Sequence, residues 1–373
     1  MKTFIQNLLY STISLININI KILFLKLKKK KIILFYHTEK ESASISLHYI
    51  NFFFLKKKNY EIFHCHISTQ KNSSIRNYYF IKQKFLKYIF GINIYICTYV
   101  SDVYPYNCKK IYIHHDIYDT PLVDQNLEKK LFIIFSNFDY IFTSSKRLAL
   151  EFKKKFEKYC FKNYSTKIIN TGYLKLQYLF LKRKNYNIKN NNNIIIAPSH
   201  LMAFKKFNCV KDLEKIISIL LKKTKFNIYL RFHPSNYDHY MVNKIILKFA
   251  KFERFFLDTS SDYFDLYINS KFMITDLSGT AYTYAFLTKN PVIFFSRNES
   301  ELLKDSNYKN LDFFKNRKKI GRIVRNTDKI LYSINNILKK KINYSNNIKK
   351  LLHSVYDDKK KPFSNIFSII KKI

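Results

Sequence analysis

Two adjacent histidines and a carboxylate follow a short apolar run in the first half of the chain. The segment IYIHHDIYDTP, residues 111–121, contains His114, His115 and Asp116. A histidine suits general-base chemistry because its ordinary pKa lies near neutral pH, and a nearby carboxylate, here Asp116 or Asp119, can orient its ring. Metal binding and plain loop hydrogen bonding are the alternatives, but the spacing matches no known metal motif closely. The segment therefore predicts a proton-transfer site without a metal.

An arginine and a histidine alternate with apolar residues at the end of a second run. The segment is NIYLRFHPSN, residues 227–236, and Pro234 is expected to end its strand. Arg231 suits bidentate contact with phosphate, and His233 can donate a hydrogen bond to a diphosphate. A single histidine at a strand end is usually structural, but the combination Arg-x-His-Pro favours an anion site.

A turn of small residues follows a third apolar run, within residues 271–295. Asp276, Ser278, Gly279 and Thr280 lie there between the run and a helical stretch. Free N–H groups at a helix N-terminus bind phosphate, hydroxyl groups add donors, and glycine lets a ligand approach the backbone closely. Ordinary capping of the helix by Ser278 or Thr280 is the structural alternative, and it is compatible with phosphate binding.

The elements that must position these residues recur along the chain as short apolar runs, each followed by a polar cluster and a helical stretch. Such runs are typical of strands buried on both faces, and their alternation with helices predicts parallel sheets. Ligands bind beyond the carboxyl ends of such strands, which adds Ser199 and His200 to the candidate contacts. The runs cover residues 32–36, 60–63, 92–96, 111–113, 140–142, 167–169, 194–196, 228–230, 255–257, 272–274 and 292–295. The clearest helices cover residues 146–159, 210–221 and 327–338.

A stretch rich in Asn and Lys, residues 182–193, interrupts this pattern and predicts a linker. We expect an α/β protein with two Rossmann-type domains whose parallel sheets face a central cleft. The expected domains cover residues 32–184 and 185–340, after an apolar and basic segment over residues 1–31. Helices over residues 341–373 are expected to pack back across the domains.

The ordered set of segments resembles the CDP-glycerol glycerophosphotransferase family over roughly residues 111–295. Arg231, His233 and Pro234 match the family's Arg-x-His-Pro motif. Residues 276–279 match its Asp-Tyr-Ser-Ser motif, with Leu and Gly in place of Tyr and the second Ser. Residues 194–200, IIIAPSH, look like its strand ending in Ala-Pro-Thr, and residues 170–179 resemble its Gly-x-Pro-Arg stretch without the Pro and Arg. Residues 114–116 read His-His-Asp where the family has His-Gly.

This resemblance implies a GT-B fold, with an acceptor domain first and a nucleotide-donor domain second, and no cofactor. It implies transfer of glycerol phosphate, or a related alditol phosphate, from a CDP-activated donor to an acceptor hydroxyl in cell-surface polymer synthesis. His115 is the preferred base over His114. The resemblance also implies that Arg231, His233, Ser278 and Thr280 stabilise the diphosphate. A nucleotide-sugar glycosyltransferase, a nucleotide-sugar 2-epimerase and a non-catalytic GT-B protein remain alternatives.

Composition bears on the partners. The chain has 373 residues and a formal net charge of +41, with lysines scattered along its whole length. It lacks helix-turn-helix, zinc-finger and RNA-binding signatures, so we expect no nucleic-acid partner, although a basic nucleic-acid-binding protein is the alternative of another class. Such charge must attract anionic lipid.

Residues 8–25 are apolar but interrupted, and a lysine run follows. This segment is either amphipathic at a membrane surface or a first helix packed on the protein. With five cysteines and no Cys-x-x-Cys pair, the chain fits a reducing cytoplasm. Together with the basic charge, the family resemblance implies a peripheral protein on the cytoplasmic face of the cell membrane, beside a membrane-linked polymer acceptor.

Overall fold

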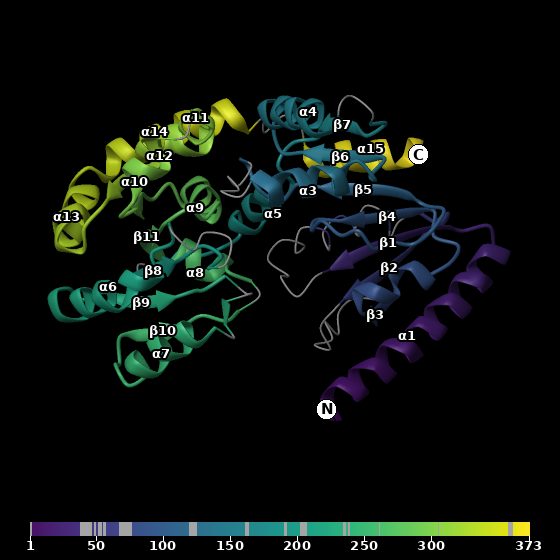
Figure 1. The fold of residues 1–373 in the computed structure, drawn as a ribbon, viewed down its shortest axis with the longest axis horizontal. Helices are drawn as coiled ribbons and strands as arrows, with labels where there is room; N and C mark the ends of the chain where they lie inside the picture. The colour runs from purple at the N-terminus through teal and green to yellow at the C-terminus, as the bar shows by residue number, and fades with distance from the viewer. Residues whose placement is uncertain are drawn as a thin grey trace. The chain divides into compact units, whose positions relative to one another are not determined.

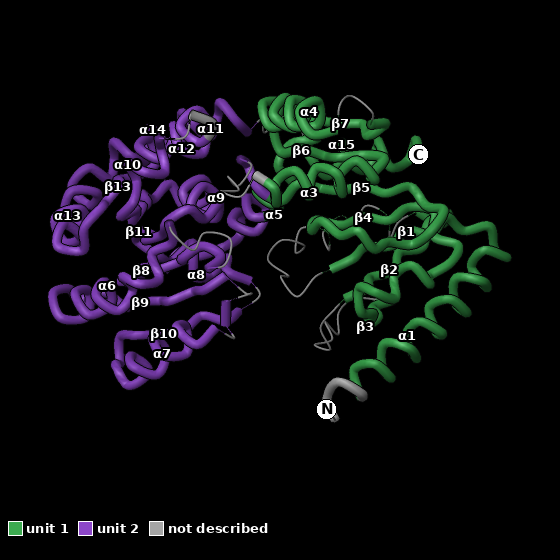
Figure 2. The backbone as a smooth tube through the Cα atoms, viewed as in Figure 1, with its two compact units in different colours: residues 1–115, 126–178, 358–373 green, residues 116–125, 179–357 purple. Residues whose placement is uncertain are grey.

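Two compact α/β units make up the chain (Figure 1). The computed structural model describes residues 2–37, 47, 50, 54, 57–66, 77–118, 125–160, 164–189, 192–201, 207–233, 236–237, 239–260, 262–304, 306–356 and 361–373. Asp119 and Pro234 lie outside these residues. Unit 1 comprises residues 1–115, 126–178 and 358–373, and unit 2 comprises residues 116–125 and 179–357 (Figure 2). The predicted boundary lay between residues 184 and 185. In the structure the chain passes into unit 2 between residues 178 and 179, within helix α5 (Leu174–Arg183), and residues 358–373 return to unit 1.

Unit 1 is built on a seven-stranded sheet in the order β3-β2-β1-β4-β5-β6-β7. All of its strand pairs are parallel. Its strands are β1 (Lys31–His37), β2 (Tyr60–His66), β3 (Tyr78–Phe80), β4 (Ile94–Cys97), β5 (Lys109–Ile113), β6 (Tyr140–Thr143) and β7 (Lys167–Asn170). Its helices are α1 (Lys2–Leu27), η1 (Gln83–Tyr88), α3 (Gln125–Phe135), α4 (Lys146–Cys160), the first half of α5 (Leu174–Arg183) and α15 (Pro362–Lys372).

One face of this sheet carries a continuous apolar core. Side chains of α1, α3 and α4 pack there against alternate residues of the strands, such as Tyr36, Tyr95 and Tyr112. The strand runs are apolar on both faces, which is why they fold as buried parallel strands. The C-terminal helix α15 also belongs to this unit. Gly172 has a φ of +93°, and a side chain there would lie 2.8 Å from Pro362 at the start of α15.

Unit 2 is built on a six-stranded parallel sheet in the order β10-β9-β8-β11-β12-β13. Its strands are β8 (Asn193–Ala197), β9 (Asn227–Leu230), β10 (Phe255–Leu257), β11 (Ser270–Thr275), β12 (Val292–Phe295) and β13 (Gly321–Val324). Its helices are α6 (Val210–Lys223), α7 (Tyr240–Phe249), α8 (Phe264–Ile268), α9 (Thr280–Thr288), α10 (Glu299–Leu302), α11 (Ser306–Lys309), α12 (Asp312–Ile320), η3 (Thr327–Lys329), α13 (Ile330–Lys339) and α14 (Lys341–Val355). Apolar residues of α6, α7 and α13 cover one face of the sheet.

The two Rossmann-type sheets confirm the predicted fold class. The strand order has the doubly wound form in which a polar edge lies at the carboxyl ends of the strands. Two strands were not predicted, and both lie at sheet edges. The first, β3, is three half-buried residues, and β13 contains Gly321 and Arg322 in a run of four. Neither has the continuous apolar pattern of the central strands.

Candidate active site

In unit 1 the two histidines after β5 have different surroundings. The His114 backbone N–H continues the sheet by donating to the Phe142 carbonyl at 2.9 Å. Its side chain is only 7% exposed, and the edge of its ring meets Phe152 at 5.5 Å between ring centres. His114 is therefore part of the core of the unit, packed among the aromatic residues of α4.

His115 is half-buried, and its ring is oriented by the backbone. Its Nδ1 lies 3.0 Å from the Thr98 carbonyl oxygen, at the end of β4. A carbonyl only accepts, so the neutral ring carries its proton on Nδ1 and its lone pair on Nε2. The His115 carbonyl in turn accepts a hydrogen bond from the Tyr173 hydroxyl at 3.1 Å. This tautomer is the one that a general base using Nε2 requires.

The two rings do not point to opposite sides of the chain, as an extended backbone would suggest. They lie 5.7 Å apart and nearly parallel, at 17°. Burial distinguishes them instead, and it favours His115 as the reactive one. Thr98 was not singled out from the sequence, since its side chain type carries no signal. Its position, one residue past an apolar strand beside β5, was the only available indication.

Asp116 follows His115 directly and groups with unit 2. Its carboxylate lies against Gly279: a β-carbon at Gly279 would stand 3.1 Å from Asp116 Oδ2. Asp116 or Asp119 was expected to orient the histidine ring, and Asp119 lies outside the described residues. In the structure His115 Nδ1 donates to the Thr98 carbonyl, and the Asp116 carboxylate lies at the turn before α9. A side chain at position 279 would make a tight contact with that carboxylate, which would have to shift by a few tenths of an ångström.

Asp276 is fully buried at the end of β11 and organises the loops around it. Its Oδ1 accepts from the N–H groups of Ser199, at 2.8 Å, and Leu277, at 2.6 Å. Its Oδ2 accepts from the Cys209 N–H at 2.8 Å, at the start of α6. One carboxylate thus ties the end of β8, the start of α6 and the turn after β11 together. In this structure its interactions are those of a positioning residue.

The turn that Asp276 holds leads into the N-terminus of α9. No side chain caps this end of the helix. Among the residues that the structure describes, the backbone N–H groups of Ser278, Gly279 and Thr280 have no hydrogen-bond acceptor. The Thr280 hydroxyl bonds to the Tyr267 hydroxyl, which fixes its position. Neither the Ser278 nor the Thr280 hydroxyl therefore caps the helix. The N-terminus of α9 presents three backbone N–H donors for an anion.

Ser199 and His200 lie beside this turn, on the loop after β8. The Ser199 hydroxyl is buried and has no hydrogen-bond partner within the described part of the chain. The His200 ring meets the His233 ring edge-on at 4.9 Å between centres. Buried Asn236 joins these loops, because it donates to the Ser199 carbonyl at 3.1 Å and accepts from the Leu201 N–H at 3.1 Å. The sequence pattern contained no signal for Asn236.

Arg231, at the end of β9, is engaged within unit 2. Its guanidinium forms an ion pair with Asp258 and donates to the Ser260 carbonyl at 2.8 Å. Burial lowers the pKa of this guanidinium, but Tyr267 and Asp258 outweigh it and the pKa ends above its ordinary value. The Arg231 side chain is 11% exposed. It therefore holds the loop after β10, and Asp258 is a partner that the sequence reasoning missed.

A separate group of histidines lies at the carboxyl ends of β1 and β2. His37 Nε2 and His64 Nδ1 are 2.9 Å apart, and the His66 ring stacks on His37 at 6.2 Å. All three are buried. Clustered histidines such as these can bind a metal ion. Within the described ranges, no group of three or more His, Cys, Asp or Glu side chains is arranged to hold a metal ion.

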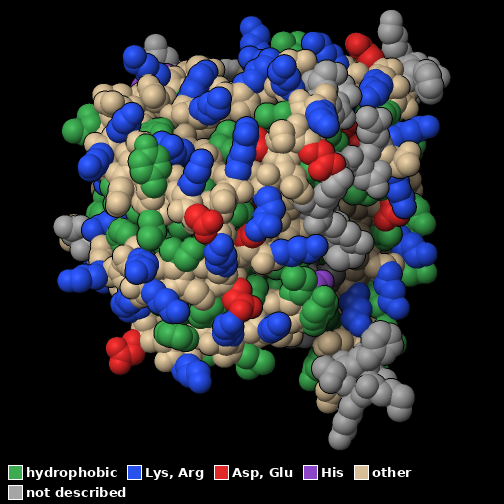
Figure 3. All heavy atoms as spheres, turned by 60° about the vertical axis from the view of Figure 1, so that its left-hand side comes forward, with side chains coloured by type: hydrophobic (Ala, Val, Ile, Leu, Met, Phe, Trp, Pro, Cys, Tyr) green, Lys and Arg blue, Asp and Glu red, His purple; other side chains and the backbone are tan. Residues whose placement is uncertain are grey.

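Positive charge is spread over the face of the molecule that Figure 3 draws. On the face drawn in Figure 3, Lys and Arg side chains lie scattered among apolar and neutral atoms, with few Asp or Glu. The attraction of the protein for anions is therefore general, and the specific contacts must come from the loops described above.

Comparison with known proteins identifies the family and the fold. The model of the family described as CDP-Glycerol:Poly(glycerophosphate) glycerophosphotransferase matches residues 113–365. No curated protein sequence matches the chain. Among solved structures, the wall teichoic acid polymerase TagF superposes with a TM-score of 0.62 at 18% identity, over 91% of this chain and 88% of that one. A putative UDP-N-acetylglucosamine 2-epimerase from Listeria monocytogenes superposes with a TM-score of 0.58 at 11% identity, over 92% and 96%. At these identities the likeness shows the fold. The chain has the GT-B-like fold of these proteins and belongs to the CDP-glycerol:poly(glycerophosphate) glycerophosphotransferase family.

Proposed function

We propose that the protein transfers glycerol phosphate from CDP-glycerol to the terminal hydroxyl of a membrane-linked polymer of the teichoic-acid type, as a peripheral protein on the cytoplasmic face of the membrane. Membership of the family supports the donor and the reaction. The TagF structures support the polymer class, since TagF is described as a wall teichoic acid polymerase and one of its structures was soaked with CDPG.

The observation that carries the donor site is the uncapped N-terminus of α9. The N–H groups of residues 278–280 point out of the first turn of the helix, where the helix dipole adds positive potential. The buried Ser199 hydroxyl lies on a loop that shares the Asp276 carboxylate with this turn. We assign the diphosphate of the donor to this place. His200 and His233 supply further donors on the adjoining loops, and Arg231 holds the neighbouring loop in position.

The base of the reaction is His115. Its Nε2 accepts the proton of the acceptor hydroxyl, while the hydroxyl oxygen forms a bond to the β-phosphorus of the donor. The bond from that phosphorus to the oxygen bridging the two phosphates breaks, and CMP leaves with the electron pair. The donors at α9 stabilise the charge that develops on the phosphate oxygens. Every atom of the step is supplied by donor, acceptor and ring, with no metal or cofactor.

The test uses purified protein with CDP-glycerol, CDP-ribitol and UDP-N-acetylglucosamine. We expect CDP-glycerol at about 100 times its dissociation constant to raise the free energy of unfolding by roughly 2.7 kcal/mol. We also expect CMP release when a poly(glycerophosphate) acceptor is added. Stabilisation by the UDP-sugar with no effect of either CDP-alditol would refute the assignment and favour a nucleotide-sugar enzyme.

A further inference from the structure

Helix α1 has two faces of different character. Its inner face packs on unit 1 through Ile18 and Ile22, and Asn19 bonds to the Tyr88 carbonyl and the Phe90 N–H, both at 2.9 Å. Its outer face carries large apolar side chains, each at least half exposed. These define the outer stripe: Leu9, Tyr10, Ile13, Ile16, Ile20, Leu23, Phe24 and Leu27. An exposed apolar surface of this extent on a soluble fold marks an interaction site.

The helix is bound to the unit along its length. The segment Gln6–Leu27 has a mean hydropathy of 1.7, enough by length and composition to cross a membrane. A helix packed on a soluble core passes the same test. The hydrogen bonds of Asn19 and of Lys21, which reaches the side chain of Asn77, fix the inner face to the sheet edge. The outer stripe is therefore presented sideways, as in a helix lying in the plane of a lipid surface.

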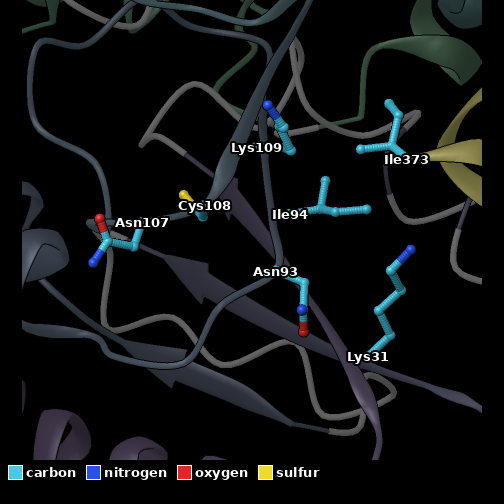
Figure 4. Close-up of a pocket in the computed structure, with 7 residues that line it drawn as sticks. All are labelled: Lys31, Asn93, Ile94, Asn107, Cys108, Lys109 and Ile373. Carbon is cyan, nitrogen blue, oxygen red and sulfur yellow. The ribbon is translucent and has the colours of Figure 1, made fainter.

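The C-terminal end of α1 leads into a basic pocket of about 560 Å³. Lys26, Lys29, Lys30, Lys31 and Lys371 contribute to its lining, together with Asn59, Tyr60 and Asn93, and none of these described lining residues is acidic. A second pocket of about 460 Å³ shares Lys31 and Asn93 and adds Lys109 (Figure 4). The pockets lie where β1, β2 and β4 begin, at the edge of the sheet opposite to His115.

The lysines of this pocket are held by neutral groups. Lys26 Nζ donates to the Asn93 side-chain oxygen at 2.8 Å, and that oxygen also accepts from the Ile32 N–H at 2.8 Å. Lys30 donates to the Lys58 carbonyl. Because these partners carry no charge, the positive charges of Lys26 and Lys30 are not neutralised by them. In the second pocket, by contrast, Lys109 forms an ion pair with Asp139 at 3.0 Å. The lysines of the first pocket are therefore the ones available to an anion. They suit a ligand with a phosphate group.

Charge complementarity decides what covers the outer stripe. A pair of helices from two copies would show charged residues flanking the seam. No charged residue lies in α1 between Lys2 and Lys21, and Lys21 and Lys26 lie toward the C-terminal end of the helix, beside the lysines of the pocket. A bilayer needs no charges along the stripe, and an anionic one attracts the lysines beside it. Phe90, 61% exposed next to Asn19, extends the apolar area.

We propose that the outer stripe of α1 and the lysine-lined pocket at its end form one docking surface for an anionic phospholipid bilayer, with the pocket taking a headgroup phosphate. This deepens the membrane attachment in the proposed function and does not depend on the donor chemistry. The surface lies at the amino edge of the first sheet, so lipid contact and proton transfer use opposite edges of one unit. A bound bilayer would thus leave the loop of His115 uncovered.

The experiment measures sedimentation of the full chain with vesicles of phosphatidylcholine, alone or mixed with phosphatidylglycerol. Deleting the helix would also remove Ile18 and Ile22 from the core, so substitutions on exposed positions are preferred. The stripe variant carries Ile13→Gln, Ile16→Gln and Ile20→Gln. The pocket variant carries Lys29→Gln and Lys371→Gln, and its control carries Lys222→Gln and Lys223→Gln, which remove the same charge from the exposed end of α6.

We expect the pocket variant to bind mixed vesicles roughly thirtyfold more weakly than the wild type, since each lysine near an anionic surface contributes on the order of 1 kcal/mol. The control should bind as the wild type does, and the stripe variant should lose binding to both kinds of vesicle. Equal binding by pocket variant and control would overturn the headgroup site.

Two further outcomes would replace the bilayer with another occupant. A wild-type dimer that becomes monomeric in the stripe variant, with vesicle binding unchanged, would assign the stripe to a second copy of the chain. Loss of affinity for soluble poly(glycerophosphate) in the pocket variant, without loss of vesicle binding, would assign the pocket to the polymer. CMP release with a soluble acceptor should persist in both variants, and this readout separates failure of the docking surface from failure of the proposed reaction.

Discussion

The carboxyl edges of the two sheets carry different chemistry on the same architecture. At the edge of the first sheet the groups are imidazoles, and His115 is oriented by a backbone carbonyl. At the edge of the second sheet the groups are backbone N–H donors and hydroxyls, while the charged side chains Asp276 and Arg231 are engaged in holding loops. A proton acceptor needs one ring in a defined tautomer, whereas an anion site needs several donors converging on one place.

Charged residues at the carboxyl edge of a sheet need not contact the ligand. Asp276 and Arg231 were selected from the sequence for their charge. In the structure the Asp276 carboxylate accepts hydrogen bonds from backbone N–H groups, and Arg231 forms an ion pair with Asp258, all within unit 2. Judged on the described residues, the groups at this edge that have unused hydrogen-bonding capacity are neutral: the N–H groups of residues 278–280 and the Ser199 hydroxyl. Removing a member of each class should therefore have different consequences.

The largest effect is expected from His115→Ala. Loss of a general base should lower turnover by about 10²–10⁴-fold while leaving affinity for CDP-glycerol nearly unchanged. The measurement is CMP release at saturating donor, together with donor affinity by calorimetry. His114→Phe is the matched control, because it keeps an aromatic ring in the core beside Phe152. A large loss from the control with none from His115→Ala would reverse the assignment, and equal tolerance of both would remove the base altogether.

Asp276→Asn should mainly affect folding. The substitution keeps the shape but removes the negative charge that accepts three backbone N–H bonds, and it turns an amide group toward one of them. Hydrogen bonds to a charged group contribute about 1.5–3 kcal/mol each, so we expect unit 2 to lose about 3 kcal/mol or more. Urea unfolding measures the loss, with Asp265→Asn on an exposed position as control. Full stability combined with weakened donor binding would make Asp276 a ligand contact instead.

Substitutions at Arg231 and Asp258 distinguish two roles for Arg231: holding the loop after β10, or contacting the diphosphate directly. If Arg231 holds the loop after β10, Arg231→Ala and Asp258→Asn should both weaken donor affinity, by about tenfold to a hundredfold, because each breaks the same ion pair. If Arg231 instead contacts the diphosphate directly, Asp258→Asn should preserve or strengthen binding, since it releases the guanidinium. Calorimetric titration with CDP-glycerol distinguishes the two results.

Most of the fold and part of the candidate site could be predicted from the sequence. Central strands such as β8 and β11 were predictable because apolar residues fill both of their faces. In contrast, β3 has only three half-buried residues, and β13 contains Gly321 and Arg322, so neither has that pattern. The turn before α9 and the histidine pair were found from residue type. Thr98, Asn236 and Asp258 were not, because they act through contacts with residues distant in the chain. Spacing cannot show which carbonyl or carboxylate folding brings to a given ring or guanidinium.

The smallest effect concerns the other end of α9. There Lys289 donates to the Phe286 carbonyl, and Arg183 donates to the Leu287 carbonyl, so cations meet the negative end of the helix. Burial, with Arg183 and Lys349 nearby, lowers the pKa of Lys289 from 10.5 to about 7. Between these two values the unfolded lysine holds a proton that the folded one lacks. The free energy of unfolding should therefore rise with pH from about 7 toward 10.

We expect the rise that Lys289 causes to be about 1 kcal/mol per pH unit or less, given that the group is partly open to solvent. Lys289→Met should remove this part of the slope, and Lys251→Met, on an exposed position, should leave it. Urea unfolding at pH 7, 8 and 9 provides the comparison. Because Lys289 lies at the end of α9 remote from residues 278–280, donor affinity at pH 7 should be the same in both variants. A loss of affinity in Lys289→Met alone would show that the two ends of the helix are coupled, and that anion binding depends on how the C-terminus of α9 is held.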